Sequence, residues 1–408
     1  MCRISGALLA WTSVGVLLGV AALYETELAV EPEVRHLAAR WNAFAVDLYK
    51  QLSHRPGNIV VSPYSVASAL TLAWAGASDD TAQQLAKVLH IDDLPTERVH
   101  AAIRAFHGHL GTRFPGKSVE LRQANSAWLR AGRQFSPGYL EQIRQYHQAE
   151  LRSLDFNDPA ATGKINSWVA EQTRGVIRSV MSKRDLQPDT LLLLISAVYF
   201  LGTWEHPFDP ENTQLAPFRV SADKEVRVPM MSQLGIFRYK ADGEVRFLSL
   251  PYRGGVASFS VFLPADASAS LQEFEKSLTV ERLEKWTTSA SRELLRIGLP
   301  RLRVHSSLNL RDDLSQLGIR NAFDPQRADF RRMLEKGNLY LDRVLHHAWL
   351  RVNETGTEAA AATRVDAKAD INKAFIANRP FLFLVLDEAS GAILFLGRIV
   401  HPLEQERD

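Results

Sequence analysis

The first part of the chain carries its apolar residues at helical spacing. Between residues 34 and 52 they recur every three or four positions, which predicts an amphipathic helix. Ser62 followed by Pro63 predicts a second helix, with the serine as N-cap and the proline in the first turn. Four further segments, 81–89, 95–110, 135–152 and 162–180, are also predicted to be helical.

After Pro188 the pattern becomes that of β-strands. Residues 191–201 form an unbroken apolar run with valine and aromatic residues, typical of a strand buried on both faces. Residues 245–251, 257–263, 294–299 and 381–386 predict shorter strands bounded by glycine, proline or charge. No repeat or linker divides the chain, so we expect one α+β domain with a large sheet core.

The N-terminus contains an apolar run over residues 4–24, preceded by Arg3. With the small residues beyond it, this run resembles a secretory signal, and its 21 residues are also enough to span a bilayer. We therefore expect residues 1–29 to be a signal peptide and the protein to be secreted, extracellular or periplasmic. The alternatives are a retained N-terminal membrane anchor and a buried helix.

Composition and motifs exclude several kinds of chemistry. The 48 Lys and Arg residues nearly balance the 46 Asp and Glu residues, so no nucleic-acid partner is expected. The only cysteine is Cys2, which leaves the body of the chain without a disulfide or a thiolate site. No metal, cofactor or hydrolase motif occurs, and the adjacent pair His346 and His347 would point to opposite faces of a strand. We expect no metal, no cofactor and no enzyme.

The most informative segment runs from Glu354 to Asp370 and alternates with a period of two. One face is small and mostly apolar: Thr357, Ala359, Ala361, Thr363, Val365, Ala367 and Ala369. The other face is charged or alanine: Glu358, Ala360, Ala362, Arg364, Asp366, Lys368 and Asp370. This predicts a segment that can become a strand with one closely covered face, and Gly356 at its base supplies a turning point. A solvent-exposed, alanine-rich connector is the alternative.

Residues 354–363 resemble the hinge of the serpin family of serine-protease inhibitors. Other resemblances follow in the family's order at 58–65 (NIVVSPYS), 165–177, 197–208, 250–252, 299–300, 328–330 and 379–381. The resemblance implies that residues 34–404 form a serpin domain with about nine helices, three β-sheets and an exposed reactive-centre loop. Its hinge comprises Glu354, Gly356, Thr357, Glu358, Ala359, Ala360, Ala361, Ala362 and Thr363.

Such a protein inhibits by suicide cleavage. A target serine protease, or alternatively a cysteine protease, cleaves the loop, the loop inserts into the central sheet, and the acyl-enzyme is trapped as a covalent complex. A monomer is expected. A non-inhibitory serpin-fold binding or chaperone protein is the alternative, although the small residues of the hinge argue against it.

The resemblance also implies a polar cluster beneath the central sheet. Ser62, Ser65 and His346 match its positions, whereas Ser196 replaces the family's usual asparagine. Trp204 matches a position where the inserting loop first enters. The plain alternatives are an N-cap for Ser62, a core histidine and a core aromatic residue.

Counting sixteen positions on from Glu354 places the cleaved bond at Asp370–Ile371. Two alternatives stay open, because Ala369 would suit an elastase-like protease and Lys368 a trypsin-like one. Residues 98–113 include several arginines but no dense basic cluster, so glycosaminoglycan binding is not expected.

Overall fold

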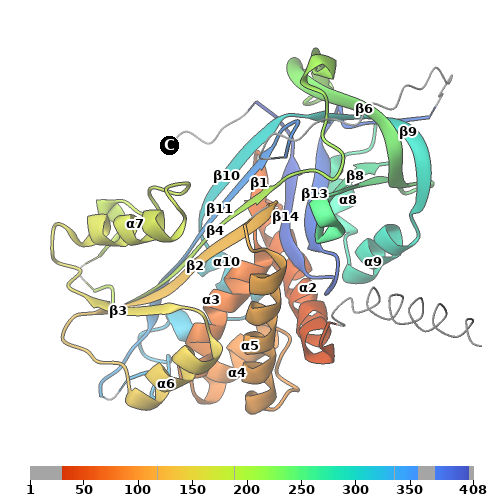
Figure 1. Ribbon diagram of the computed structural model, residues 1–408. Coiled ribbons are helices and arrows are strands. Elements are labelled where there is room, and N and C mark those ends of the chain that lie inside the picture. Colours follow the sequence, from red (N-terminus) through yellow and green to blue (C-terminus); the bar gives the residue numbers. More distant parts are fainter. Residues whose placement is uncertain (1–29, 117, 188, 335, 357–372, 404–408) are drawn as a thin grey trace, which may run out of the picture.

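The computed structural model describes residues 30–116, 118–187, 189–334, 336–356 and 373–403. Within these ranges the chain forms nine α-helices and two extensive β-sheets (Figure 1). The helices are α2 (Pro32–Leu52), α3 (Pro63–Gly76), α4 (Asp79–Val88), α5 (Thr96–Arg113), α6 (Pro137–Tyr146), α7 (Ala161–Gln172), α8 (Leu271–Lys276), α9 (Val280–Thr288) and α10 (Arg311–Leu317). The same ranges contain four 3₁₀ turns: η1 (Lys183–Asp185), η2 (Pro210–Asn212), η3 (Arg253–Gly255) and η4 (Asn321–Phe323).

The central sheet has five strands in the order β10-β11-β4-β2-β3. Their bounds are β10 (Leu302–Asn309), β11 (Leu341–Val352), β4 (Leu192–Gly202), β2 (Val119–Arg130) and β3 (Glu150–Leu154). At its middle, β4 and β11 run parallel, and their register places His346 beside Ser196. Because residues 192–202 also pair with β2, the predicted central strand is confirmed.

The second sheet has nine strands, in the order β1-β14-β13-β8-β7-β6-β9-β12 with β5 paired to β6. Their bounds are β1 (Ile59–Val61), β5 (Gln214–Arg219), β6 (Glu225–Ala241), β7 (Val245–Pro251), β8 (Ala257–Pro264), β9 (Ser291–Pro300), β12 (Ala374–Ile376), β13 (Phe381–Asp387) and β14 (Ile393–Ile399). The long strand β6 pairs with β5 and β9 along most of its length and with β7 only at its end. Three sheets were expected, and two of them are joined here into one nine-stranded sheet by the long strand β6. The predicted α+β class is confirmed.

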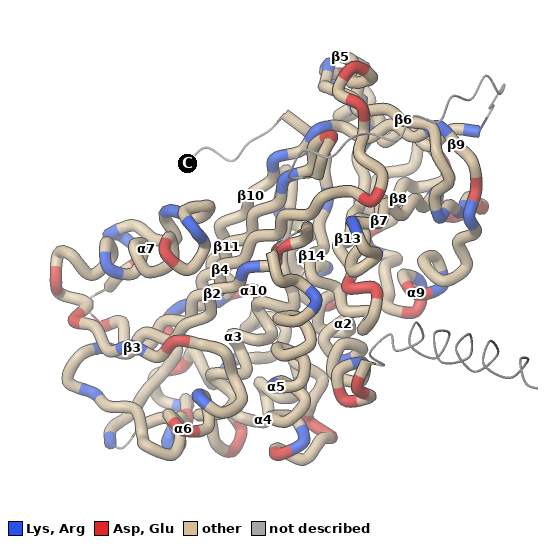
Figure 2. Tube along the Cα trace, viewed as in Figure 1, with Lys and Arg blue, Asp and Glu red and all other residues tan. Residues whose placement is uncertain are grey.

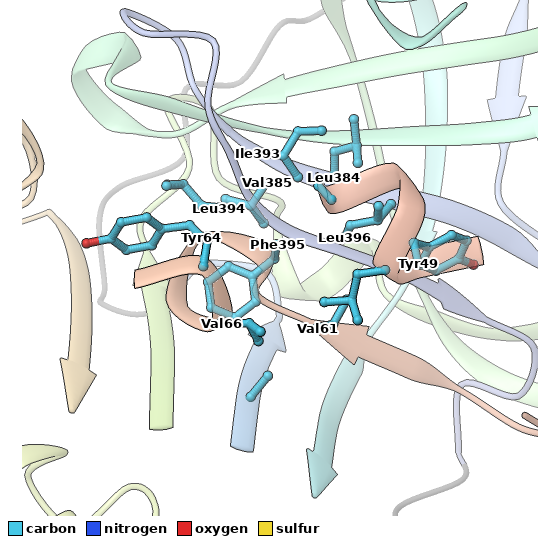
Figure 3. Close-up of a cluster of buried hydrophobic side chains, with 14 of the residues drawn as sticks. Tyr49, Val61, Tyr64, Val66, Leu384, Val385, Ile393, Leu394, Phe395 and Leu396 are labelled. Carbon is cyan, nitrogen blue, oxygen red and sulfur yellow. The ribbon is translucent and has the colours of Figure 1, made fainter. Parts of the chain in front are cut away.

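Two apolar cores hold these layers together. Helices α2 and α3 pack against β13 and β14, where Tyr64 and Phe395 lie among buried aliphatic side chains (Figure 3). On the opposite face of the central sheet, Ile195 of β4 joins Trp168 of α7 in a smaller cluster. Strand β4 is consequently buried on both faces, as its unbroken apolar run predicts.

The helix predicted over residues 135–152 is wrong in its second half. Helix α6 ends at Tyr146, and Glu150–Leu154 instead form β3, which pairs in parallel with β2. The buried side chain of His147 accounts for the break, since its two ring nitrogens contact Thr71 and His100. These tertiary contacts hold the chain extended where the local sequence favours a helix.

Acidic and basic positions are interspersed along the chain (Figure 2), in keeping with its formal net charge of +2. Among the helices of the described ranges, none combines the length and the apolar composition needed to cross a membrane. The apolar run at residues 4–24 lies outside those ranges.

Candidate functional site

The candidate site is the seam between the parallel strands β4 and β11. After β11 ends at Val352, residues 353–356 turn across the end of β4. A strand formed by the residues that follow would run back down the seam, antiparallel to both neighbours. The seam is closed in this structure by pairing that runs from Arg343 opposite Leu193 to Leu350 opposite Phe200. One further pair, Leu341 opposite Leu192, lies beyond a shift in register.

A chain of hydrogen bonds crosses the seam at its centre. The Ser62 amide donates to Nε2 of His346 over 3.0 Å, and Nδ1 of that ring lies 3.0 Å from the Ser196 hydroxyl. The Ser196 and Ser65 hydroxyls are 2.8 Å apart, and the Ser65 hydroxyl donates to Asn125 Oδ1 over 3.3 Å. All five residues are buried. We call this group the seam relay.

One backbone amide sets the direction of the whole relay. Because Nε2 of His346 accepts from the Ser62 amide, the proton of the neutral ring must sit on Nδ1 and be donated to Ser196. Ser196 then donates to Ser65, which in turn donates to Asn125. Every hydroxyl thereby has a partner, which buried polar groups require.

The structure brings together the four relay residues picked out from the sequence and adds Asn125. This residue lies on β2 directly opposite Ser196, and its amide nitrogen also donates to the Ser65 carbonyl. An amide from the neighbouring strand thus serves the cluster, at whose position 196 the sequence has a serine where the resemblance implies an asparagine. The N-cap role of Ser62 is present as well, since its hydroxyl accepts from the Ser65 amide.

Burial keeps His346 neutral. Desolvation, reinforced by the neighbouring His347, lowers the pKa of His346 to about 3. The two rings occupy opposite faces of β11: His346 joins the relay, whereas desolvation and nearby His305 lower the pKa of His347 to about 4. No group of three or more potential metal ligands occurs in the described ranges.

At the upper end of the seam, Trp204 anchors the chain that leaves β11. Its indole donates to the Asn353 carbonyl over 2.8 Å, and its backbone amide donates to the Thr355 carbonyl over 3.2 Å. The ring is buried and stacks on Tyr252 with centroids 4.4 Å apart. Trp204 therefore contacts the first residues after β11 directly and is more than a core aromatic.

Glu354 fixes the same segment electrostatically. Its carboxylate accepts from the Thr213 hydroxyl at 2.5 Å and from Arg301 Nε at 2.6 Å. Burial opposes the charge, but these two hydrogen bonds outweigh it and lower the pKa of Glu354. The residue is only 6% exposed, so this ion pair is a structural anchor.

Gly356 is required sterically at this position. Its φ is +83°, and a Cβ atom would collide with the carbonyl oxygen of Gly202 at the end of β4. Only glycine allows the chain to pass so close to β4. The remaining predicted hinge residues, from Thr357 to Thr363, and the candidate cleavage positions Lys368, Ala369, Asp370 and Ile371 lie outside the described residues.

Comparison with known proteins places this geometry in a family. Residues 39–402 match the family model for Serpin, described as serine protease inhibitor. The chain belongs to the serpin family. It is 36% identical over 383 residues to a leukocyte elastase inhibitor from Bos taurus and 34% identical to one from Homo sapiens. Both alignments cover 90% of this chain and 100% of the relative.

Solved structures show the same fold. Uncleaved ovalbumin matches with a TM-score of 0.82 and 30% identity, covering 90% of this chain and 100% of ovalbumin. As a serpin, the protein is a serine protease inhibitor acting by the serpin mechanism, and its partner is a serine protease. Inhibitors of this family are generally non-catalytic.

The comparisons overturn the predicted localisation. The leukocyte elastase inhibitors matched here are intracellular serpins that lack signal peptides. The prediction of a secreted protein, and with it the membrane-anchored alternative, is therefore wrong. The apolar composition of residues 4–24 is shared by signals, anchors and other apolar segments, which is why composition alone misled the prediction.

We predict that Ser196→Ala destabilises the closed seam. The change leaves the His346 Nδ1–H and the Ser65 hydroxyl short of a buried partner, at a cost of about 1–3 kcal/mol. Thermal unfolding measures the loss. Ser260→Ala is the matched control, because Ser260 is equally buried and its hydroxyl has no hydrogen-bond partner among the described residues. Equal melting temperatures for the two variants would contradict a structural role for the relay.

We further predict that stability falls as the pH drops below about 6.5. The unfolded chain takes up a proton on each histidine there, whereas folded His346 stays neutral down to about pH 3, so acid favours unfolding. Urea unfolding of the parent and of His346→Gln, whose amide can still accept from Ser62 and donate to Ser196, is compared at pH 7.5 and 5.5. The variant should lose less stability over this interval; an identical loss would contradict the assignment.

Proposed function

We propose that this serpin presents the bond 370–371 to a serine protease and traps the acyl-enzyme by inserting the preceding residues between β4 and β11. The product is a covalent complex, the inhibitor acts as a monomer, and it catalyses no reaction of its own. The observation that carries the proposal is the path of residues 353–356, which turn from the end of β11 over the end of β4. Residues 353–356 thus bring the start of the loop to the end of the seam, which supports insertion there.

The exchange of strand pairings supports insertion. Opening the seam breaks one parallel ladder, between β4 and β11. An inserted strand would then make two antiparallel ladders, one with each neighbour, and antiparallel pairing is slightly more stable per residue. Each additional hydrogen bond contributes about 0.5–1.5 kcal/mol net, so a strand of a dozen residues gains enough to drive the change.

The composition of residues 357–369 supports the same proposal. The face made by Thr357, Ala359 and Ala361 holds side chains that fit a closely covered strand. The seam they would enter is lined on both faces, by Leu194 of the larger core and Ile195 of the cluster beneath α7. Small side chains allow entry between packed layers with little overpacking.

The identity of the cleaved bond decides the class of target protease. Counting from Glu354 gives Asp370–Ile371, which calls for a protease that accepts an acidic residue. The name of the relatives, leukocyte elastase inhibitor, favours instead the alternative at Ala369, which fits a small specificity pocket. Lys368 would select a trypsin-like enzyme.

A panel of three serine proteases, with acidic, elastase-like and trypsin-like specificity, tests the proposal. We expect one of them to give a denaturant-resistant band at the summed mass of the two proteins, with release of a C-terminal peptide. Mass analysis of that peptide locates the bond at 368, 369 or 370. Cleavage by all three enzymes without any covalent band would contradict trapping and would favour a non-inhibitory serpin-fold protein.

Thr357→Arg should convert the inhibitor into a substrate. An arginine on the small face cannot be buried in the seam, so cleavage would proceed while the covalent band is lost. Glu358→Arg is the matched control, because it introduces the same side chain on the charged face. The ratio of trapped to cleaved inhibitor is read by gel densitometry. Equal ratios for the two variants would show that the alternation of faces is irrelevant.

A further inference from the structure

An apolar patch lies exposed on the outer face of β6 and β9. Ile236 is 62% exposed and Leu294 is 42% exposed, and the register places them directly opposite each other. Leu234, two residues before Ile236, presents a third partly exposed apolar side chain to the same face. We call Leu234, Ile236 and Leu294 the outer patch. Large apolar side chains gathered on a sheet face in this way are typical of an interaction surface.

Arginines border the outer patch on β9. Arg296 pairs in register with Leu234, and Arg292 lies two residues from Leu294 on the same face. Both side chains are exposed, and neither forms an ion pair with another described residue. The nearest acidic residue on β9, Glu293, points to the other face, where it pairs with Lys373. A partner suited to this surface would combine apolar and acidic groups.

The patch lies next to the point where the chain returns from the reactive loop. Strand β12 begins at Ala374, which is paired with Arg296, and the Arg296 amide donates to the Lys373 carbonyl. Because β12 and β9 are parallel, Lys373 is level with Leu295, and the chain enters β12 from the side of Leu294. The outer patch and the end of the loop thus share one edge of the sheet.

Covalent geometry then limits how far the cleaved bond can lie from the patch. Three residue steps connect Ile371 to Ala374, and they span at most about 11 Å when fully extended. A stable protein–protein contact covers about 800 Å² on each partner and so extends roughly 15 Å from its centre. A protease seated on bond 370–371 is therefore large enough to cover Leu294 and Ile236.

We propose that the outer patch and its two arginines are a secondary docking site for the target protease. The occupant is the enzyme bound at the reactive loop, and it presents an apolar area bordered by carboxylates. This inference rests on the proposed function and adds a determinant of target choice that is separate from the residue at the cleaved bond. Two proteases with the same specificity pocket would then be inhibited at different rates.

The second-order rate of inhibition reports on this contact. As long as the encounter complex dissociates faster than the protease is acylated, the second-order rate of inhibition is proportional to the affinity of that complex. Weaker docking therefore lowers the rate by the same factor as the affinity. The arginines add electrostatic steering, which salt screens. The outer patch should therefore affect how fast the protease is captured and leave the fate of the captured enzyme, which depends on the seam, unchanged.

The test uses the protease that forms the covalent complex with the parent protein. Ile236→Thr and Leu294→Thr should each slow inhibition about tenfold with an unchanged number of inhibitor molecules consumed per enzyme. Leu140→Gln is the matched control, since Leu140 is 37% exposed on α6, distant from β9 (Figure 1). Arg292→Glu combined with Arg296→Glu should slow inhibition and flatten its salt dependence, whereas Arg178→Glu, also exposed, should do neither.

Rates within twofold of the parent for both threonine variants would overturn the docking site while leaving the trapping mechanism intact. A lower rate accompanied by a larger fraction of cleaved, untrapped inhibitor would also overturn it, because that result would place the effect on insertion. If the parent forms no covalent complex with any protease, the proposed function itself fails, and the docking site fails with it.

Discussion

The structure depends on a parallel ladder between β4 and β11 that closes the middle of the central sheet. Parallel pairing is the weaker of the two kinds of ladder. Here it joins β4 to β11, and a further strand placed between these two could pair with both of them. Both faces of the seam are covered, by the core around α3 and by the cluster under α7. The protein consequently keeps a closed sheet that could accommodate one more strand at low steric cost.

The seam relay explains how such a seam can be both closed and able to open. Apolar interdigitation across β4 and β11 would resist separation at every residue, whereas hydrogen bonds among hydroxyls, an imidazole and an amide can be exchanged for others. The relay extends beyond the seam itself, because Ser62 and Ser65 begin α3 and Asn125 lies on β2. Movement of β4 away from β11 must therefore change the hydrogen bonds that α3 and β2 make with the relay.

Sequence patterns predicted the elements that are specified by interactions between neighbouring residues or by an unbroken run of apolar residues. Helix α2, the N-cap of α3 and the buried strand β4 belong to this class, because periodicity, a capping serine and an unbroken apolar run each act over neighbouring residues. The polar residues of the relay were found only through resemblance to a family. Asn125 was missed, because its role arises from pairing with Ser196, 71 positions away, and leaves no local signal.

Elements that the sequence patterns did not predict, or predicted wrongly, have a comparable cause. Strand β11 contains Asp342, Arg343 and two histidines, and its burial becomes favourable only when partners from other strands satisfy them. Residues 147–152 were predicted to be helical because the contacts of His147 and the pairing of β3 with β2 are tertiary and leave no local signal. The hinge stays a prediction: its alternation with a period of two suggests a strand-forming segment, and its assignment as a hinge rests on resemblance to the family.

The attachment of both loop ends to the same region explains why cleavage is needed. Glu354 is bonded to Arg301, which directly follows β9, and β12 is paired with β9 itself. Seventeen residue steps connect Gly356 to Lys373. Each residue that enters the seam carries the chain about 3.4 Å away from its anchor, and the uninserted residues must cover the same distance back to Lys373 at no more than about 3.5 Å each. About half of the steps are therefore needed for the way back, which limits an intact loop to roughly eight inserted residues. Cutting the loop at the proposed bond would remove the return path, so the full alternating segment would become available to the sheet. The two anchors therefore keep the uncut protein in its closed form, and the protease supplies the one covalent change that releases it.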